Sequence, residues 1–149
     1  MKRKIVVELS AFLLMSLFLY ASFSKWFMFS TFRNDIDNQP FPNGLTPWII
    51  YGIPPLEVLI TLALMFERTR TSGFYASLIL MLAFSLYTAA VLLDFFAYVP
   101  CSCGGIIRDL SWKNHLILNL FFVAISLAGI LLRRNRFSKD ETKKMVIAS

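Results

Sequence analysis

The two cysteines of the chain form a Cys-x-Cys pair, a spacing that can carry thiol–disulfide chemistry. Cys101, Ser102 and Cys103 are followed by Gly104 and Gly105. The two cysteine Cα atoms lie at most about 7 Å apart in a fully extended chain, so a slight bend brings them within the roughly 4.4–6.8 Å that a disulfide allows. A disulfide across so short a loop is strained, and strained, exposed disulfides tend to be labile or catalytic. The pair is therefore a candidate redox centre.

Three interpretations of this pair compete: a redox dithiol, a small structural staple, and a soft-metal site for an ion such as Cu(I). A staple that closes so short a loop removes little conformational entropy from the unfolded chain. A Cu(I) site needs further ligands, which only His115 and some methionines can supply. We favour the redox dithiol.

His115 is the only histidine of the chain and follows Cys103 by twelve residues. Near a thiol, an imidazole can lower the thiol pKa or shuttle its proton. Alternatively, His115 is an interfacial residue that is hydrogen-bonded to a loop carbonyl. Asn119 lies four residues later on the same helix face, where it can orient the imidazole or bond a neighbouring helix.

Glu57 and Asp94 are ionisable residues in or near apolar runs, where functional or paired use is the default expectation. Pro54-Pro55 predicts a kink or a restart of the helix, which places Glu57 in a new first turn that favours a carboxylate. Glu57 then either pairs with Lys25 or caps this turn, or it serves in proton transfer or as a quinone contact. Asp94 is expected to reach water at the outer end of its helix.

The composition and the apolar runs predict the elements that position these residues. The chain is 57% hydrophobic with a mean hydropathy of +0.63, and each of four runs is near the roughly 20 residues that a bilayer-spanning helix needs. The sequence thus predicts an all-α, polytopic membrane protein, with a four-transmembrane-helix bundle in residues 1–136 and a short, polar, disordered cytoplasmic tail in residues 137–149. The four predicted spans are Ile5–Ser24, Leu45–Phe66, Phe74–Tyr98 and His115–Leu132.

The lysine and arginine residues are distributed unevenly about these spans. Of the 15, eleven fall at the two termini and in the loop after the second span, and four fall in the other two loops. The positive-inside rule therefore predicts that both termini are cytoplasmic in a bacterial inner membrane. The cysteine loop then faces the periplasm, where disulfides persist. The net charge of +6 reflects this orientation, and a nucleic-acid partner is not expected.

The first outer loop, residues 25–46, is rich in Asn, Asp, Pro and Gly, which are typical of turns. Aromatic residues flank this loop and are expected to seat its ends in the headgroup region. The loop is thus predicted to cover the outer mouth of the bundle.

Over residues 5–132 the chain resembles the MauE/DoxX family of four-helix membrane proteins. The resemblance rests mainly on the Cys-x-Cys-x-Gly element and is completed by shorter motifs. The matching residues are Ser24-Lys25 with Phe32 beyond it, Pro55-Leu56-Glu57, Cys101-Ser102-Cys103-Gly104-Gly105, and Leu110-Ser111-Trp112 leading into His115 and Asn119. The family motif often has a bulky residue before its last glycine, where this chain has Gly104.

The resemblance implies thiol–disulfide exchange with a periplasmic thioredoxin-like partner. Cys101 and Cys103 would carry the exchange and His115 would handle protons, while Glu57 and Asn119 are speculative cofactor contacts. A quinone is a possible electron acceptor by analogy with other four-helix oxidants. The alternatives are a non-catalytic membrane scaffold subunit and a Cu(I)-handling membrane protein.

Overall fold

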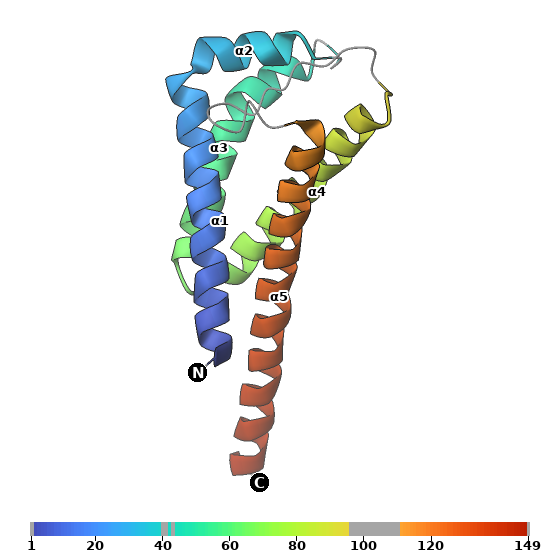
Figure 1. Cartoon of the computed structure of the whole chain (residues 1–149). Helices are drawn as coiled ribbons and strands as arrows, with labels where there is room; N and C mark the ends of the chain where they lie inside the picture. Colours follow the sequence, from blue (N-terminus) through green and yellow to red (C-terminus); the bar gives the residue numbers. More distant parts are fainter. Residues whose placement is uncertain (1, 40–41, 43, 96–110, 149) are drawn as a thin grey trace.

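The computed structural model of the chain describes residues 2–39, 42, 44–95 and 111–148, with side chains up to residue 134. This part of the chain is almost entirely helical and contains no strand. The helices are α1 (Lys2–Phe27), α2 (Phe29–Asp37), α3 (Thr46–Met65), α4 (Arg70–Leu92) and α5 (Trp112–Ala148) (Figure 1). All but α2 contain a stretch long and apolar enough to cross a membrane. The predicted all-α bundle of four membrane-spanning helices is confirmed.

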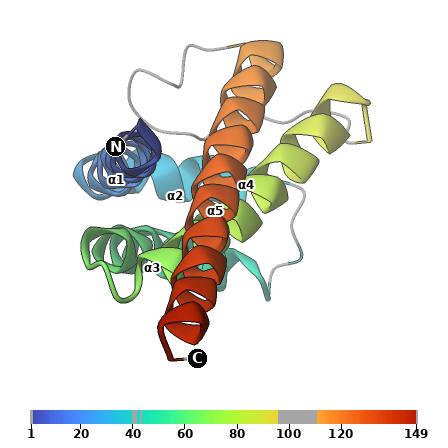
Figure 2. The ribbon, with the colours of Figure 1, turned by 90° about the horizontal axis from the view of Figure 1, so that it is seen from below.

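The four long helices pack as two pairs, α1 with α3 and α4 with α5 (Figures 1 and 2). Further contacts of α1 with α5 and of α3 with α4 join the pairs. The short helix α2 lies across the end of the bundle where α1 ends and α3 begins, and both termini lie at the opposite end (Figure 1). We call these the α2 end and the terminal end.

Two glycines allow close approaches between helices. A Cβ atom on Gly129 of α5 would lie 2.4 Å from the Phe74 ring of α4. A Cβ atom on Gly73 of α4 would lie 2.9 Å from the backbone nitrogen of Leu64 in α3. Small residues at such crossings let membrane helices gain van der Waals contact.

The terminal end is joined by arginine side chains. Arg70 is buried, pairs with Glu8 at 2.7 Å between Nη1 and Oε1, and donates from Nε to the Leu64 carbonyl at 2.8 Å. Arg133 donates from Nε to the Thr71 hydroxyl at 2.9 Å and from Nη2 to the Glu67 carbonyl at 3.0 Å. The bonds to the Leu64 and Glu67 carbonyls satisfy backbone acceptors at and just beyond the end of α3 that have no helical partner.

The predicted restart after Pro54-Pro55 is wrong, since α3 runs through both prolines without a break. Proline lacks an N–H group, but membrane helices tolerate it where a neighbouring helix supplies polar partners. Here α1 packs along α3, and the Ser22 hydroxyl donates to the Pro54 carbonyl at 3.0 Å. Glu57 therefore lies within α3 rather than in a new first turn.

The third predicted span is shifted, because α4 begins at Arg70 rather than Phe74 and ends at Leu92 rather than Tyr98. Asp94 ends the helix with a φ of 55°. The N–H of Phe95 bonds to the Ala90 carbonyl and the N–H of Asp94 to the Val91 carbonyl, both at 3.2 Å, which is the pattern of a Schellman motif. Asp94 is exposed, and its contact with water stays a prediction.

Two segments that were expected to lack regular structure are helical. In the predicted first outer loop, α2 forms because Phe32 and Ile36, one turn apart, pack with Ile50 of α3. This burial outweighs the low helix propensity of its Asn and Asp residues. The predicted disordered tail is also wrong, since α5 continues to Ala148. Residues 137–148 contain no Pro or Gly, so an established helix can propagate through them.

Candidate functional site

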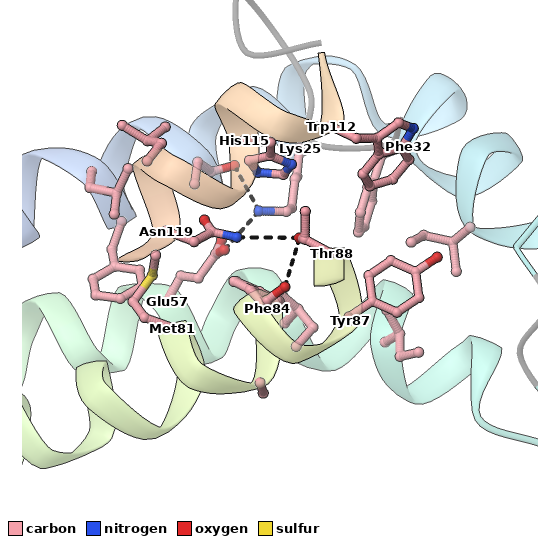
Figure 3. Close-up of a pocket in the computed structure, with 18 residues that line it drawn as sticks. Lys25, Phe32, Glu57, Met81, Phe84, Tyr87, Thr88, Trp112, His115 and Asn119 are labelled. Atoms are coloured by element: carbon pink, nitrogen blue, oxygen red, sulfur yellow. Dashed lines mark hydrogen bonds and ion pairs between the residues drawn. The ribbon is translucent and has the colours of Figure 1, made fainter. Parts of the chain in front are cut away.

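A pocket of about 230 Å³ lies at the α2 end, with walls from all five helices (Figure 3). Most of its lining is apolar, including Leu17, Ile53, Met81 and Leu118. A smaller set of lining side chains carries polar groups. This set is Lys25, Glu57, Tyr87, Thr88, Trp112, His115 and Asn119. An apolar pocket with a few convergent polar groups is the usual form of a small-molecule site.

Lys25 and Glu57 form an ion pair in the wall of the pocket. The lysine Nζ lies 2.7 Å from Glu57 Oε1, and the two side chains are 8% and 0% exposed. Lys25 Nζ also lies 3.5 Å from the Ala21 carbonyl and 5.9 Å from the centre of the Phe32 ring. The structure thus shows the predicted pairing of Glu57 with Lys25.

The second carboxylate oxygen of Glu57 is less well satisfied. Oε2 is buried, and no donor among the described residues bonds to it. An unpaired buried acceptor costs the free energy needed to remove it from water. Glu57, which lines the pocket, therefore has one paired carboxylate oxygen and one that lacks a donor among the described residues.

The packing of α1 on α3 sets the position of this ion pair. Lys25 lies in the last turn of α1, where the helix dipole favours a cation. Ser22, three residues earlier, bonds to Pro54, which is three residues before Glu57. Because α1 and α3 run in opposite directions, Lys25 and Glu57 lie about one turn to either side of this hydroxyl contact. Their side chains tilt toward the N-terminal ends of their helices and so extend toward each other to form the ion pair.

His115 lies in the first turn of α5, which begins at Trp112 and hence slightly before the predicted start. The imidazole is buried, and its ring centre lies 6.3 Å from that of Trp112. Figure 3 shows both rings among the residues that line the pocket with Lys25. His115 thus lines the pocket, and both of its predicted roles, an action on the thiols and an interfacial hydrogen bond to a loop carbonyl, stay predictions.

Asn119 lies one turn beyond His115 and links α5 to α4. Its Nδ2 donates to the Thr88 hydroxyl at 3.4 Å, and this hydroxyl donates to the Phe84 carbonyl at 2.7 Å. Asn119 and Thr88 are both buried. Of the two predicted roles for Asn119, the structure shows the bond to a neighbouring helix.

The α2 segment covers part of the pocket. Phe32 and Ile36 of α2 line it, and the Tyr87 hydroxyl of α4 hydrogen-bonds to Gln39, just beyond α2. Sequence analysis missed Ser22, Tyr87 and Thr88 as site residues. The available signal was their polar groups within apolar runs, because such groups need partners inside a membrane.

Cys101 and Cys103 lie outside the described residues. The segment that contains them leaves α4 after Leu92 and enters α5 at Trp112, and both of these helix ends lie at the α2 end (Figure 1). Among the residues that the structure does describe, no group of three His, Cys, Asp or Glu side chains is arranged to hold a metal ion.

These features define a polytopic α-helical membrane protein with a largely apolar pocket and an ion pair between its first two spans. Residues 3–132 match the family described as Methylamine utilisation protein MauE, so the chain belongs to this family. No curated protein and no solved structure matches this chain.

Proposed function

We propose that this protein is a thiol–disulfide redox protein of the bacterial inner membrane. It exchanges equivalents with a periplasmic thioredoxin-like partner through Cys101 and Cys103. The observation that carries this proposal is the isolated Cys-x-Cys pair, between α4 and α5 in a member of the MauE family. The 11-to-4 distribution of lysine and arginine supports a periplasmic position for this segment.

The exchange proceeds through two thiol–disulfide steps. The thiolate of one cysteine attacks a sulfur of the partner disulfide, forms a mixed disulfide and releases one partner thiolate. The second cysteine then attacks the mixed disulfide, closes the Cys101–Cys103 bond and releases the second partner thiolate. Two electrons pass from the membrane protein to its partner, and the reverse sequence oxidises the partner.

His115 is the proposed proton-handling group. It lines the pocket at the first turn of α5, which directly follows the cysteine segment. An imidazole can take up the proton that a thiol releases when it becomes a nucleophile. The Lys25–Glu57 pair lines the same pocket.

The test uses single cysteine variants and a purified thioredoxin-like partner from the same organism. Cys101→Ser and Cys103→Ser should each abolish disulfide exchange, and one of them should trap a mixed disulfide with the partner. Ser102→Ala is the matched control and should retain exchange. Non-reducing gel electrophoresis after acid quenching measures both results.

A double variant, Cys101→Ser with Cys103→Ser, separates the redox function from a scaffold function. If it supports partner oxidation as well as the native chain does, the cysteines are not the active site. Bound Cu(I) at one ion per native chain, lost in the same variant, would instead support metal handling.

A further inference from the structure

We infer that the pocket at the α2 end binds the ring of a lipid-soluble quinone, with Lys25 and Glu57 as its polar contacts. The binding site rests on the described pocket alone. Its use as the electron acceptor for the cysteine pair rests on the proposed function. A ring in this position would connect a periplasmic dithiol to the quinone pool of the membrane.

The size of the pocket fits one substituted ring. An apolar protein cavity of about 150 Å³ accommodates benzene, and this pocket has about 230 Å³. The additional volume suits ring substituents but not the headgroup and paired chains of a phospholipid. The aromatic side chains of Phe32, Phe84 and Trp112 line it and can pack against a planar ring.

The polar groups of the pocket match both redox states of a quinone. Glu57 Oε2 is a buried acceptor without a donor among the described residues, and a hydroquinone hydroxyl supplies that donor. Lys25 Nζ has three protons and, among the described residues, contacts two acceptors, Glu57 Oε1 at 2.7 Å and the more distant Ala21 carbonyl at 3.5 Å. Its remaining proton can be donated to a quinone carbonyl. A hydrocarbon chain would leave both groups unsatisfied.

The pocket also has an opening that suits a ligand with a lipid tail. Ala83 lines the pocket and is exposed, although it lies well inside the apolar α4 span. An exposed residue at this depth faces lipid in a membrane. The close contact of α3 with α4 at Gly73 and Leu64 lies toward the other end of these helices. The mouth at Ala83 therefore lets a ring enter sideways while its tail stays in the bilayer.

The redox step balances without a further reactant. The Cys101–Cys103 dithiol gives up two electrons and two protons and becomes a disulfide. The quinone takes up two electrons and two protons and becomes a hydroquinone. The reverse reaction reduces the disulfide, so the same site serves either direction.

The test is photolabelling of the purified full-length protein in lipid nanodiscs with an azido-quinone. Label should appear in pocket peptides of α3, α4 or α5 and should be displaced by excess decyl-ubiquinone. Decylbenzene, which has the tail and ring without oxygens, should not displace it. Glu57→Leu should lower labelling by at least about tenfold, as expected for loss of a hydrogen bond to a charged group.

Glu57→Leu could fail to fold, so a lipid-facing pair of variants provides a second measurement. Ala83→Phe should block the mouth and reduce the competed labelling by at least about tenfold, whereas Leu86→Phe is the matched control and should not. Leu86 is 72% exposed and does not line the pocket. Equal labelling of the two variants, or displacement by decylbenzene, would overturn the quinone site.

The double cysteine variant separates this inference from the proposed function. It should retain full, competed labelling, because no cysteine belongs to the pocket as described. Labelling without partner exchange in the native protein would refute the redox function and leave the quinone site standing. Exchange without competed labelling would refute the quinone site and leave the redox function standing.

Discussion

Lys25 is an ionisable residue in a largely apolar environment, and Glu57 is its ion-pair partner there. Removing two charges from water costs several kcal/mol per ion, which their attraction offsets only in good geometry. The separation of 2.7 Å provides that geometry. Either charge buried without its partner would cost more free energy than the ion pair does, so each residue depends strongly on the other.

We predict that Lys25→Met destabilises the bundle by about 3–5 kcal/mol, because it leaves the Glu57 carboxylate buried and unpaired. The double variant Lys25→Met with Glu57→Leu should recover most of this loss. Unfolding of the purified protein with increasing sodium dodecyl sulfate measures both free energies. Arg33→Met is the control, since the ion pair of Arg33 with Asp37 is exposed. Additive losses in the double variant would show that the two side chains act independently.

The site could be predicted in part from single residues. Glu57 and His115 stand out because they are ionisable groups in or beside apolar runs, and Lys25 was proposed as the partner of Glu57. Ser22, Tyr87 and Thr88 did not stand out, because small and amphipathic polar residues are common in membrane helices. Their roles depend on which helix lies opposite, and periodicity within one run carries no such information.

At the scale of the helices, close packing depends on two positions that lack a side chain. Gly129 meets Phe74, and Gly73 meets the Leu64 backbone. Helices in lipid gain little from apolar burial against each other, because lipid is equally apolar, so close contact matters more. A methyl group at either crossing must separate the helices or displace its neighbour.

We predict that Gly73→Ala and Gly129→Ala each destabilise the bundle by about 1–3 kcal/mol through overpacking. Gly52→Ala should instead be neutral or stabilising by up to about 1 kcal/mol, because alanine favours helix and nothing lies within 4 Å of its added Cβ. Parallel detergent unfolding curves of the three variants check the contrast in sign. A loss at Gly52 equal to that at Gly73 would argue against these crossings.

The apolar runs located all four long helices, because a bilayer requires about 20 apolar residues per span. Local sequence was less informative about their ends and about α2. The αL turn at Asp94 ended α4 before its apolar residues ran out. Packing with Ile50 made a helix of a segment whose composition is typical of turns. The restart expected at Pro54-Pro55 was wrong, because α3 packs against α1 there. The local sequence does not show which helix lies beside a proline.

At the scale of the whole molecule, the two ends of the bundle differ. At the terminal end, Arg70 joins α4 to α1 and α3, and Arg133 joins α5 to α4 and to the segment between α3 and α4. The α2 end holds the pocket and the chain segments that lead to and from the cysteines. This asymmetry agrees with the proposed orientation, in which the α2 end faces the periplasm and the terminal end faces the cytoplasm.

We predict that both termini are cytoplasmic and that the segment after α2 is periplasmic, as the charge distribution indicates. A reporter that is active only in the periplasm should give no signal when fused after Ser149 and a strong signal when inserted after Asn38. A reporter active only in the cytoplasm should give the reverse. Matching signals at the two positions would contradict four spans.

The exposure of Ala83 in the wall of the pocket sets the concentration scale for any molecule that enters there. Such a molecule equilibrates with the bilayer, so its mole fraction in lipid determines occupancy and its concentration in water does not. An apparent Kd expressed per volume of water will therefore rise as empty vesicles are added. Affinities for this site become comparable between preparations only when they are expressed per lipid.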